Sequence, residues 1–449
     1  MRTNVRAKNL LRTHEGAIAA IINKEQALRR SVMSCLLFEN EFYEDGEEIA
    51  GRISNLAAEV DPKIVAEIAI EARTKMHLRH APLLLLDVLS RTAAGRDDQL
   101  LAKTIEQVII RGDEPAEFLA LYTKGGDRRL APKGNGRQFT AQVMKGIELA
   151  LGHFDAYQLA KYDRDAKVKL RDVFRIVRPK PANDGQRQLW GDAKDGKLPA
   201  PDTWEVALSG GADKKEAFTR LLQENKLGYM ALLRNLRNMA QAGVDPSLVE
   251  EKLLLRKGAA RVLPFRYIAA ARAAPQFEPA IDKALLAAIG DMPAFDGKTF
   301  VLIDVSGSMD WALSQKSDLK RIDAGAALAA VFPGEVRLFT FSDNVVEVPA
   351  RKGMAGVDAI VRSQPHNGTQ MGRAVSHLNV LATNNGLGKG TRLVVISDEQ
   401  TSDRVPDPLF ERAYMINVAS AKNGVGYGRW THIDGFSENV FRFMREFER

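Results

Sequence analysis

The sequence has a single cysteine and no apolar run long enough to cross a membrane. Cys35 cannot form an internal disulfide, which is typical of a reducing compartment, and we expect an inert thiol in a helix. No stretch approaches the roughly 18 uninterrupted apolar residues of a membrane-spanning helix, and the basic N-terminal segment lacks the apolar core of a signal peptide. We therefore expect a cytoplasmic protein that makes no membrane contact.

Common signatures of hydrolases and nucleotide-binding proteins are also missing. The seven histidines include no H-E-x-x-H pair, and no serine lies in a G-x-S-x-G turn. The segment GLGKGTR, residues 386–392, lacks the P-loop spacing and precedes a strand, whereas a P-loop follows one. His366 could be read as a catalytic base only if it lay within hydrogen-bond reach of a substrate. We expect that the protein is not an enzyme.

Positive charge is unevenly distributed along the chain. The formal net charge is +7, yet residues 296–449 hold equal numbers of acidic and basic side chains. The whole excess therefore lies upstream, and residues 121–180 alone contain 14 basic against 6 acidic side chains. A basic surface concentrated on one domain is typical of proteins that bind a polyanion such as a nucleic acid.

The 449 residues are enough for two or three domains, and the first 290 or so have a helical pattern. Apolar residues recur three and four apart over 61–93, with a break at Pro82, and again over 225–255. Successive helix pairs favour an all-α solenoid, with an irregular helical domain as the alternative. We expect 122–138 to be a basic loop, and 178–204 to be a long connection that packs through two tryptophans, Trp190 and Trp204.

After about residue 296 the pattern changes to short β-branched or aromatic runs separated by helical segments. The expected strands lie within 298–306, 335–342, 391–398 and 413–419. Strands that are apolar on both faces and alternate with helices predict a doubly wound parallel α/β domain. The turn at Asp343-Asn344 predicts one antiparallel edge strand, and residues 437–448 a final helix.

Oxygen-bearing side chains follow two of these strands. Asp304, Ser306 and Ser308 come directly after the first, and Asp398 follows the strand at 392–397. In a doubly wound sheet both carboxylates would lie at the same edge, and Thr369 could point into the same crevice. Such a set, without imidazole or thiolate, suits Mg²⁺, or another hard cation such as Mn²⁺ or Ca²⁺, with a position open to an acidic side chain or a phosphate of a partner. We expect Gly307 to permit the tight curl of the loop.

The order of these five residues resembles the metal-ion-dependent adhesion site of von Willebrand factor A domains, with Gln370 where that family often has aspartate. Upstream, residues 169–181, 230–239 and 262–273 are similar to helices of the TROVE module in Ro ribonucleoproteins. The chain thus resembles bacterial Ro proteins, with a HEAT-like TROVE ring at 1–290 and an A domain at 296–449.

The resemblance implies a ring of helical repeats with a positively charged hole. Such a ring admits single-stranded ends of misfolded or non-coding RNA and binds Y-like RNA on its outside. The implied role is a monomeric scaffold in RNA quality control or processing, with an exoribonuclease or another protein as a potential partner through the A domain.

The helix before Pro179 carries the clearest RNA-binding pattern. It has one apolar stripe, made by Leu170, Val173, Phe174 and Val177, and a second stripe of basic side chains that would face solvent. Leu170 stands where the family tends to place a histidine. His77, like His80, could contact RNA or serve a structural role, and Asn235, beside Arg234, could equally be structural. The predicted RNA contacts are Arg137, Lys145, Lys161, Arg164, Lys167, Arg171, Arg175, Arg178, Lys180, Arg234 and His80.

Three interpretations compete with RNA binding. The basic stripe could simply be a solvated helix face. The protein could be a metal-dependent interaction module whose A domain engages a partner carboxylate, with the solenoid as a docking arm. A nuclease would require metal-dependent RNA cleavage that is lost on Asp398→Ala.

Overall fold

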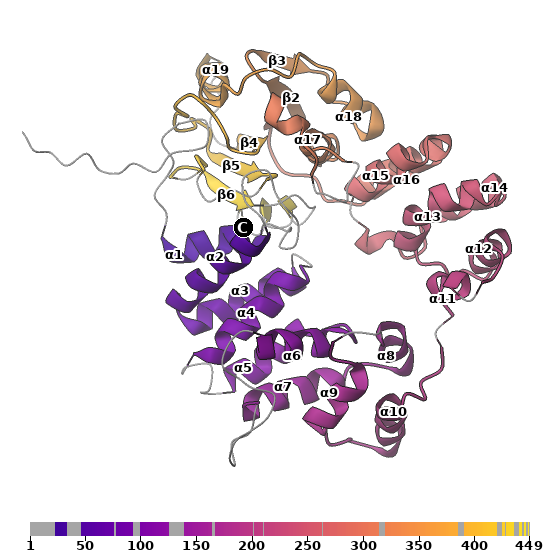
Figure 1. Ribbon diagram of the computed structural model, residues 1–449. Coiled ribbons are helices and arrows are strands. Elements are labelled where there is room, and N and C mark those ends of the chain that lie inside the picture. The colour runs from indigo at the N-terminus through magenta and orange to yellow at the C-terminus, as the bar shows by residue number, and fades with distance from the viewer. Residues whose placement is uncertain are drawn as a thin grey trace, which may run out of the picture. The chain divides into compact units, whose positions relative to one another are not determined.

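The computed structural model divides into two compact units, one within residues 24–206 and one made chiefly of residues 207–449 (Figure 1). The residues that the structure describes are 23–33, 46–75, 78–92, 99–124, 139–163, 167–200, 202–209, 211–262, 264–313, 319–384, 390–419, 424–426, 428–434, 440–441, 444–445 and 448.

The first unit is helical throughout its described part. Helix α3 packs on α4 and α5, α5 packs on α7, and α9 packs on α6 and α10, so helices stack in succession. Their facing sides form one continuous apolar core. The helices are α1 (Lys24–Met33), α2 (Gly46–Glu59), α3 (Pro62–Thr74), α4 (His80–Arg91), α5 (Leu100–Val108), α6 (Glu114–Lys124), α7 (Ala141–Leu151), α8 (Ala156–Tyr162), α9 (Leu170–Val177) and α10 (Asp184–Asp195).

The break between α3 and α4 lies before the proline that was expected to cause it. Helix α3 ends at Thr74, and α4 begins at His80, so Pro82 is inside the first turn of α4. A proline is tolerated there because the first N–H groups of a helix have no carbonyl partner within it. The expected break at Pro82 itself is therefore wrong by several residues.

The expected long connection at 178–204 is also wrong, because residues 184–195 within it form helix α10. The side chain of Asn183 accepts a hydrogen bond from Gln186 N at 2.8 Å, which caps the first turn. Gly196, with φ +69°, ends the helix in the left-handed conformation that glycine favours. Most Pro, Gly and Asp residues of this stretch lie near or beyond the two ends of α10. Trp190 is buried as expected, and Trp204, partly buried, begins α11 (Trp204–Ser209).

The second unit begins with further stacked helices that lead directly into the sheet. Helix α13 packs on α15 and α14 on α16, and α15 and α16 then pack on helices of the α/β part. Arg272 forms an ion pair with Asp358 at 2.9 Å, and Asp282 Oδ1 accepts a hydrogen bond from Met354 N at 2.8 Å. The helices are α12 (Lys214–Gln223), α13 (Tyr229–Gln241), α14 (Pro246–Leu255), α15 (Pro264–Ala273) and α16 (Glu278–Gly290). The domain boundary between 290 and 296 stays a prediction.

The α/β part of this unit contains a sheet with six strands among the described residues, in the order β3-β2-β1-β4-β5-β6. All neighbours are parallel except β2 and β3, which pair in antiparallel fashion as the sequence predicts. The strands are β1 (Thr299–Asp304), β2 (Val336–Phe341), β3 (Val345–Val348), β4 (Arg392–Ser397), β5 (Arg412–Asn417) and β6 (Thr431–Asp434). The sequence pattern does not predict the short β6. Most of the final helix expected at 437–448 lies outside the described residues.

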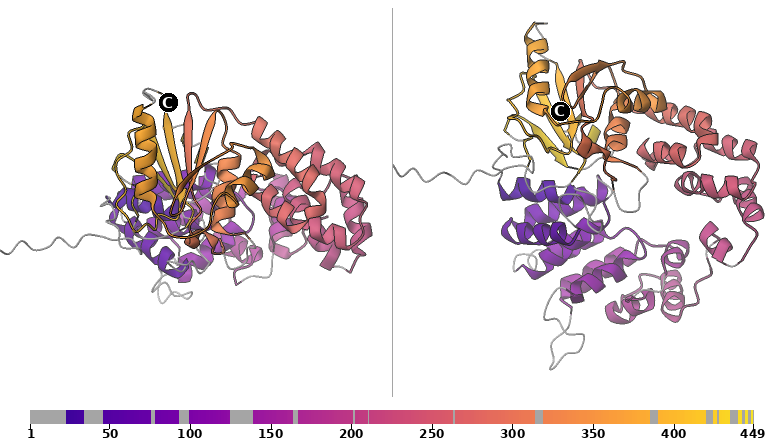
Figure 2. Two further views of the ribbon diagram at one scale, coloured as in Figure 1. Left: turned by 90° about the horizontal axis from the view of Figure 1, so that it is seen from above. Right: turned by 45° about the horizontal axis from the view of Figure 1, so that its top comes forward.

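Helices cover both faces of the sheet, which explains why its strands are apolar on both sides. Alternate residues such as Phe300 and Leu302 share a core with α19 (Met371–Asn384), while Ile303 lies near Gly325 of α17 (Arg321–Ala330) on the other face. In Figure 2 the sheet lies between α19 and the pair formed by α17 and α18 (Gly353–Val361). The predicted fold class, helical repeats followed by a doubly wound α/β domain, is confirmed. None of the described helices has the length and apolar character needed to cross a membrane.

Replacing Gly372 with alanine tests the packing at the start of α19. A Cβ at Gly372 would lie 2.1 Å from the carbonyl oxygen of Arg404, so backbone must move to admit it. We expect a loss of about 1–3 kcal/mol in folding free energy, as for other overpacked sites, and a lower melting temperature by circular dichroism. Gly191→Ala, in α10 with open space around its Cα, is the matched control and should not be destabilising. An unchanged melting temperature for Gly372→Ala would contradict this close approach.

Candidate metal and nucleic-acid sites

The two carboxylates predicted as metal ligands lie at one edge of the sheet. Asp304 is the last residue of β1, and Asp398 directly follows β4, the neighbour of β1. The chain proceeds from β1 to β2 on one side and later places β4 on the other, so this is the point where the topology reverses. Both side chains are fully buried.

Hydrogen bonds draw the first three oxygen donors together. Asp304 Oδ1 accepts a hydrogen bond from Ser306 N at 2.8 Å, and Oδ2 accepts one from Ser397 Oγ at 2.6 Å. The hydroxyl oxygens of Ser306 and Ser308 are 3.3 Å apart. Ser306 is buried and Ser308 is partly exposed, so the loop extends from the buried carboxylate of Asp304 toward the protein surface.

The loop that contains Thr369 is held between the loops after β1 and β4. Gly307 N donates to Asn367 O at 2.9 Å, and the carbonyl oxygen of Thr369 accepts from Thr401 Oγ1 at 3.2 Å. The structure therefore brings all five candidate donors to the same sheet edge. The curl at Gly307 does not depend on glycine: its φ is not positive, and a Cβ would meet Asn367 O at an ordinary 3.5 Å.

Burial of these carboxylates shifts the ionisation of one of them. Removal from water, together with the negative charge of Asp398, raises the pKa of Asp304 to about 7, although hydrogen bonds from Ser306 and Ser397 oppose the shift. The same two carboxylates would be stabilised in their charged form by a divalent cation.

The donor set fits a hard cation that keeps open coordination positions. Two carboxylate and three hydroxyl groups are the oxygen ligands that Mg²⁺, Mn²⁺ and Ca²⁺ prefer. Within the described part of the chain, no three or more His, Cys, Asp or Glu side chains are grouped as a metal site. The candidate site therefore depends on its hydroxyl oxygens, and its metal stays a proposal.

His366 is held too firmly to be a free base. Its Nδ1 is 2.7 Å from Asp310 Oδ2, and its Nε2 is 2.9 Å from the carbonyl oxygen of Val361. Lys320 Nζ is 2.9 Å from the other oxygen of Asp310. Burial raises the pKa of Asp310, but the hydrogen bonds from Lys320 and His366 outweigh it and lower that pKa overall. These contacts support a structural role for His366.

In the helical unit, α9 has the predicted apolar stripe and part of the predicted basic stripe, because the helix begins at Leu170 and Lys167 precedes it. Its apolar residues Leu170, Val173, Phe174 and Val177 are buried. Arg171 and Arg175 are exposed on the helix, and Arg178 is exposed at its C-cap, where its Nε donates to the carbonyl oxygen of Arg175 at 3.3 Å. Asp172 is only a loose partner of Arg175, at 4.0 Å. The exposed stripe therefore remains strongly cationic.

A cavity of about 200 Å³ adjoins this stripe. It lies between α4, α6, α8 and α9, and the exposed Lys167 is at its wall. Arg79 bonds to Asp113 at 2.7 Å and to Glu117, while the guanidinium of Arg111 stacks 4.5 Å from the ring centroid of Tyr162. The cavity is lined by Arg79, Gly112, Asp113, Ala116, Glu117, Ala120, Tyr162, Lys167, Val168 and Leu170.

Two other predicted contacts lie close to that cavity in the chain. Lys161 Nζ is 5.5 Å from the ring centroid of Tyr157 and 5.9 Å from that of Tyr162, which places a cation over aromatic rings at the end of α8. Although part of the His80 side chain is exposed, desolvation by the surrounding chain and the charge of Arg79 lower its pKa to about 4. His80 is therefore neutral near pH 7 and can stack or hydrogen-bond but adds no charge.

The remaining predicted RNA contacts are dispersed. Lys145 is exposed on α7 and pairs with Glu148 at 3.2 Å, and Lys180 is exposed after α9. Arg137, Arg164 and His77 lie outside the described residues, as do Cys35 and residues 125–138 of the basic loop.

Arg234 lies in the second unit, exposed on α13. Its neighbour Asn235 is buried and serves the helix itself: its Nδ2 donates to the carbonyl oxygen of Ala231 at 2.9 Å, and its Oδ1 accepts from Asn238 at 3.0 Å. The structural role considered for Asn235 is therefore local to α13.

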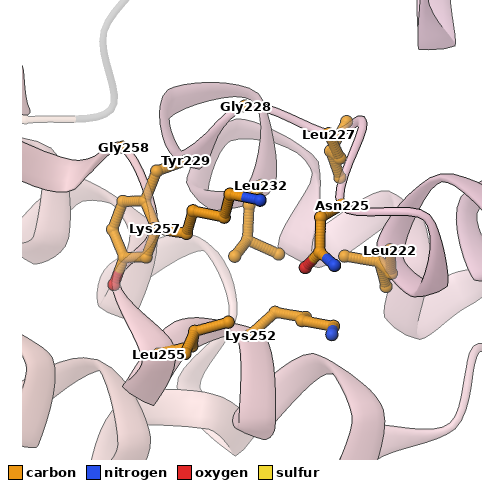
Figure 3. Close-up of a pocket in the computed structure, with 10 residues that line it drawn as sticks. All are labelled: Leu222, Asn225, Leu227, Gly228, Tyr229, Leu232, Lys252, Leu255, Lys257 and Gly258. Carbon is orange, nitrogen blue, oxygen red and sulfur yellow. The ribbon is translucent and has the colours of Figure 1, made fainter.

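A second cavity, of about 230 Å³, was missed by sequence reasoning (Figure 3). The side chains of Lys252, Lys257 and Asn225 line the same space, together with apolar side chains that include Leu232 and Leu255. Two cations and an amide can accept an anionic group. The lysines lie on either side of the end of α14, and only the fold brings Asn225 opposite them.

Comparison with known proteins agrees with this architecture. Residues 186–289 match the family model of the TROVE domain, and residues 295–420 match that described as VWA domain containing CoxE-like protein. The TROVE match covers Arg234 and the cavity of Figure 3, whereas α9 and its basic stripe precede it. The chain thus combines a TROVE segment with a following von Willebrand A-type segment.

A solved structure shares the fold over nearly the whole length of the chain. The crystal structure of the Deinococcus radiodurans Ro (RSR) protein superposes with a TM-score of 0.61 at 18% identity, covering 95% of this chain and 99% of that one. Telomerase protein component 1 of mouse and of rat is 34% and 33% identical over 87 residues. Those residues are 18% of this chain and only 3% of these curated relatives.

The predicted resemblance to a bacterial Ro protein, with TROVE followed by an A domain, is confirmed by the two domain matches and the shared fold. The predicted absence of enzymatic activity stays a prediction.

Proposed function

We propose that this Ro-type protein binds single-stranded RNA through its helical part, chiefly by phosphate contacts from the exposed face of α9. The observation that carries the proposal is the cationic stripe of Arg171, Arg175 and Arg178, held outward by a fully packed apolar stripe on the same helix. Phosphate contacts from such a stripe are independent of sequence, which suits a protein that receives varied RNAs.

The surroundings of α9 support contacts beyond phosphate. Lys161 over Tyr157, and the neutral imidazole of His80, are side-chain types on which unpaired bases stack or form hydrogen bonds. Misfolded or non-coding RNA with a single-stranded end, and Y-like RNA, are the proposed ligands. RNA quality control or processing in the cytoplasm is the proposed setting, with an exoribonuclease or another protein as a further partner.

For the A domain we propose a Mg²⁺ site held by Asp304, Ser306, Ser308, Thr369 and Asp398, which the arrangement of the three loops supports. When bound, the cation would supply an electrophilic position for an anionic group of a partner. The residues of this chain orient the site: Ser397 fixes Asp304, and Thr401 fixes the Thr369 loop. The second candidate function is a protein-interaction module that engages a partner carboxylate. It requires the proposed metal site at this edge of the sheet.

Filter binding across a series of salt concentrations tests RNA binding. We expect an RNA with a single-stranded 3′ end to bind more tightly than a blunt duplex. If at least three phosphates are contacted, the logarithm of its association constant should fall with the logarithm of salt concentration with a slope of about −2 or steeper. No affinity at low salt, or an affinity that salt does not change, would refute the proposal.

A further inference from the structure

A buried arginine lies at the candidate metal edge. Arg321, the first residue of α17, is 1% exposed, and its Nη1 is 3.4 Å from Oδ2 of the fully buried Asp398. Its backbone N donates to the carbonyl oxygen of Trp311 at 3.0 Å, which ties the start of α17 to the segment after Ser308. The guanidinium of Arg321 therefore brings a positive charge of the chain itself to the candidate site.

Several other charged groups near this edge have partners of their own. Glu399 follows Asp398, but its carboxylate bonds to His432 and accepts a hydrogen bond from Val425 N at 3.0 Å. Asp310 is paired with Lys320. Asp403 accepts hydrogen bonds from Gly372 N and Arg373 N, each at 2.8 Å. Arg321, by contrast, contacts a candidate ligand carboxylate directly.

The charge of Arg321 makes the site differ from one built of two carboxylates alone. A bound divalent cation would hold both carboxylates in their charged form, so that the cation, the two carboxylates and Arg321 would together have a net charge of about +1. Without the arginine, the same cation would leave the cluster neutral. An excess positive charge in a buried site is unfavourable unless an anion neutralises it.

We propose that Arg321 couples the two binding events at this edge, so that a divalent cation binds weakly alone and tightly together with an external carboxylate. The inference rests on the proposed metal site and concerns its regulation. By linkage, the carboxylate must strengthen cation binding by the same factor by which the cation strengthens carboxylate binding. The A domain would then retain its cation mainly while an acidic partner is bound.

The test is titration of the full chain with Mn²⁺, followed by the electron paramagnetic resonance signal of free Mn²⁺, in chloride and in acetate of equal ionic strength. For the wild-type protein we expect acetate to raise the Mn²⁺ affinity about 10-fold, within the 5- to 150-fold range typical of such coupling. Arg321→Met should bind Mn²⁺ about 10-fold more tightly in chloride and lose most of the acetate effect. Arg337→Met, which removes an exposed guanidinium paired with Glu347 on the same sheet, should behave like wild type.

The possible outcomes distinguish an error in the proposed role of Arg321 from an error in the proposed metal site. If neither wild type nor Arg321→Met binds Mn²⁺, the metal site is wrong. If Mn²⁺ binds but folded Arg321→Met shows unchanged or weaker affinity, or keeps the acetate effect, the role of Arg321 is wrong. Should circular dichroism show that Arg321→Met does not fold, Arg321→Lys, which keeps the charge, must retain the acetate effect. Absence of the acetate effect in the wild-type protein overturns the inference without any variant.

Discussion

Reversing the charges of Arg171 and Arg175 together is expected to weaken binding of single-stranded RNA about 100-fold at low salt. Each arginine is exposed on α9, and its replacement by glutamate removes one phosphate contact and adds a repulsive charge. Filter binding with a labelled RNA that has a single-stranded 3′ end measures the loss. The salt dependence should become less steep by about 1.4 units of slope, because two contacts disappear.

The matched control is Lys63→Glu with Lys103→Glu, which makes the same change in net charge on exposed positions of α3 and α5. This control should weaken binding only slightly, through the general field of the protein. Equal losses for the two double variants would mean that the net charge of the protein, and not the α9 stripe, attracts RNA. Circular dichroism should show both variants folded, since neither pair packs into a core.

Replacing Asp304 with asparagine is expected to lower the affinity for Mn²⁺ at least about 100-fold and to leave RNA affinity unchanged. Changes to groups that support a metal ligand typically lower metal affinity 10- to 100-fold. Loss of the carboxylate ligand itself should lower the affinity at least as much. Asparagine can still accept the hydrogen bond from Ser306 N, so the loop should keep its fold. Calorimetric titration with Mn²⁺ and filter binding with RNA give the two readouts.

Asp343→Asn is the matched control, because Asp343 accepts a hydrogen bond from Gly368 N at the same rim but is not one of the five donors. It should retain Mn²⁺ binding. If Asp304→Asn also abolished RNA binding, the metal site and the RNA site would be one functional unit. Loss of a protein partner with RNA binding intact would favour the interaction module as the main activity.

The fold was predictable from the sequence where periodicity is strong, and less so where short polar segments intervene. The four apolar strands were recognised because all residues of β1 and β4, and most of those of β2 and β5, are buried. Helix α19 was recognised because its buried residues recur three and four apart. Helix α10 was mistaken for a connection because most of its residues are polar and only Trp190 and Ala193 are buried on it. The four-residue β6 had too few residues to show a pattern.

The metal edge was more accessible to sequence reasoning than the RNA-binding face. Asp304 and Asp398 end adjacent strands, and a doubly wound topology brings such strand ends together. Arg321 could not be foreseen as their neighbour, since it begins a helix and nothing in the sequence says that its guanidinium is buried. The cavity lined by Lys252, Lys257 and Asn225 likewise depends on how α14 packs on α12.

The most direct test of the proposed function is ultraviolet crosslinking of the protein to its RNA in cells, followed by mass spectrometry of the crosslinked peptides. Binding through the α9 face predicts crosslinks concentrated between Tyr157 and Lys180, on RNAs with single-stranded ends. Recovery of no RNA, or crosslinks confined to the α/β segment after residue 295, would contradict it.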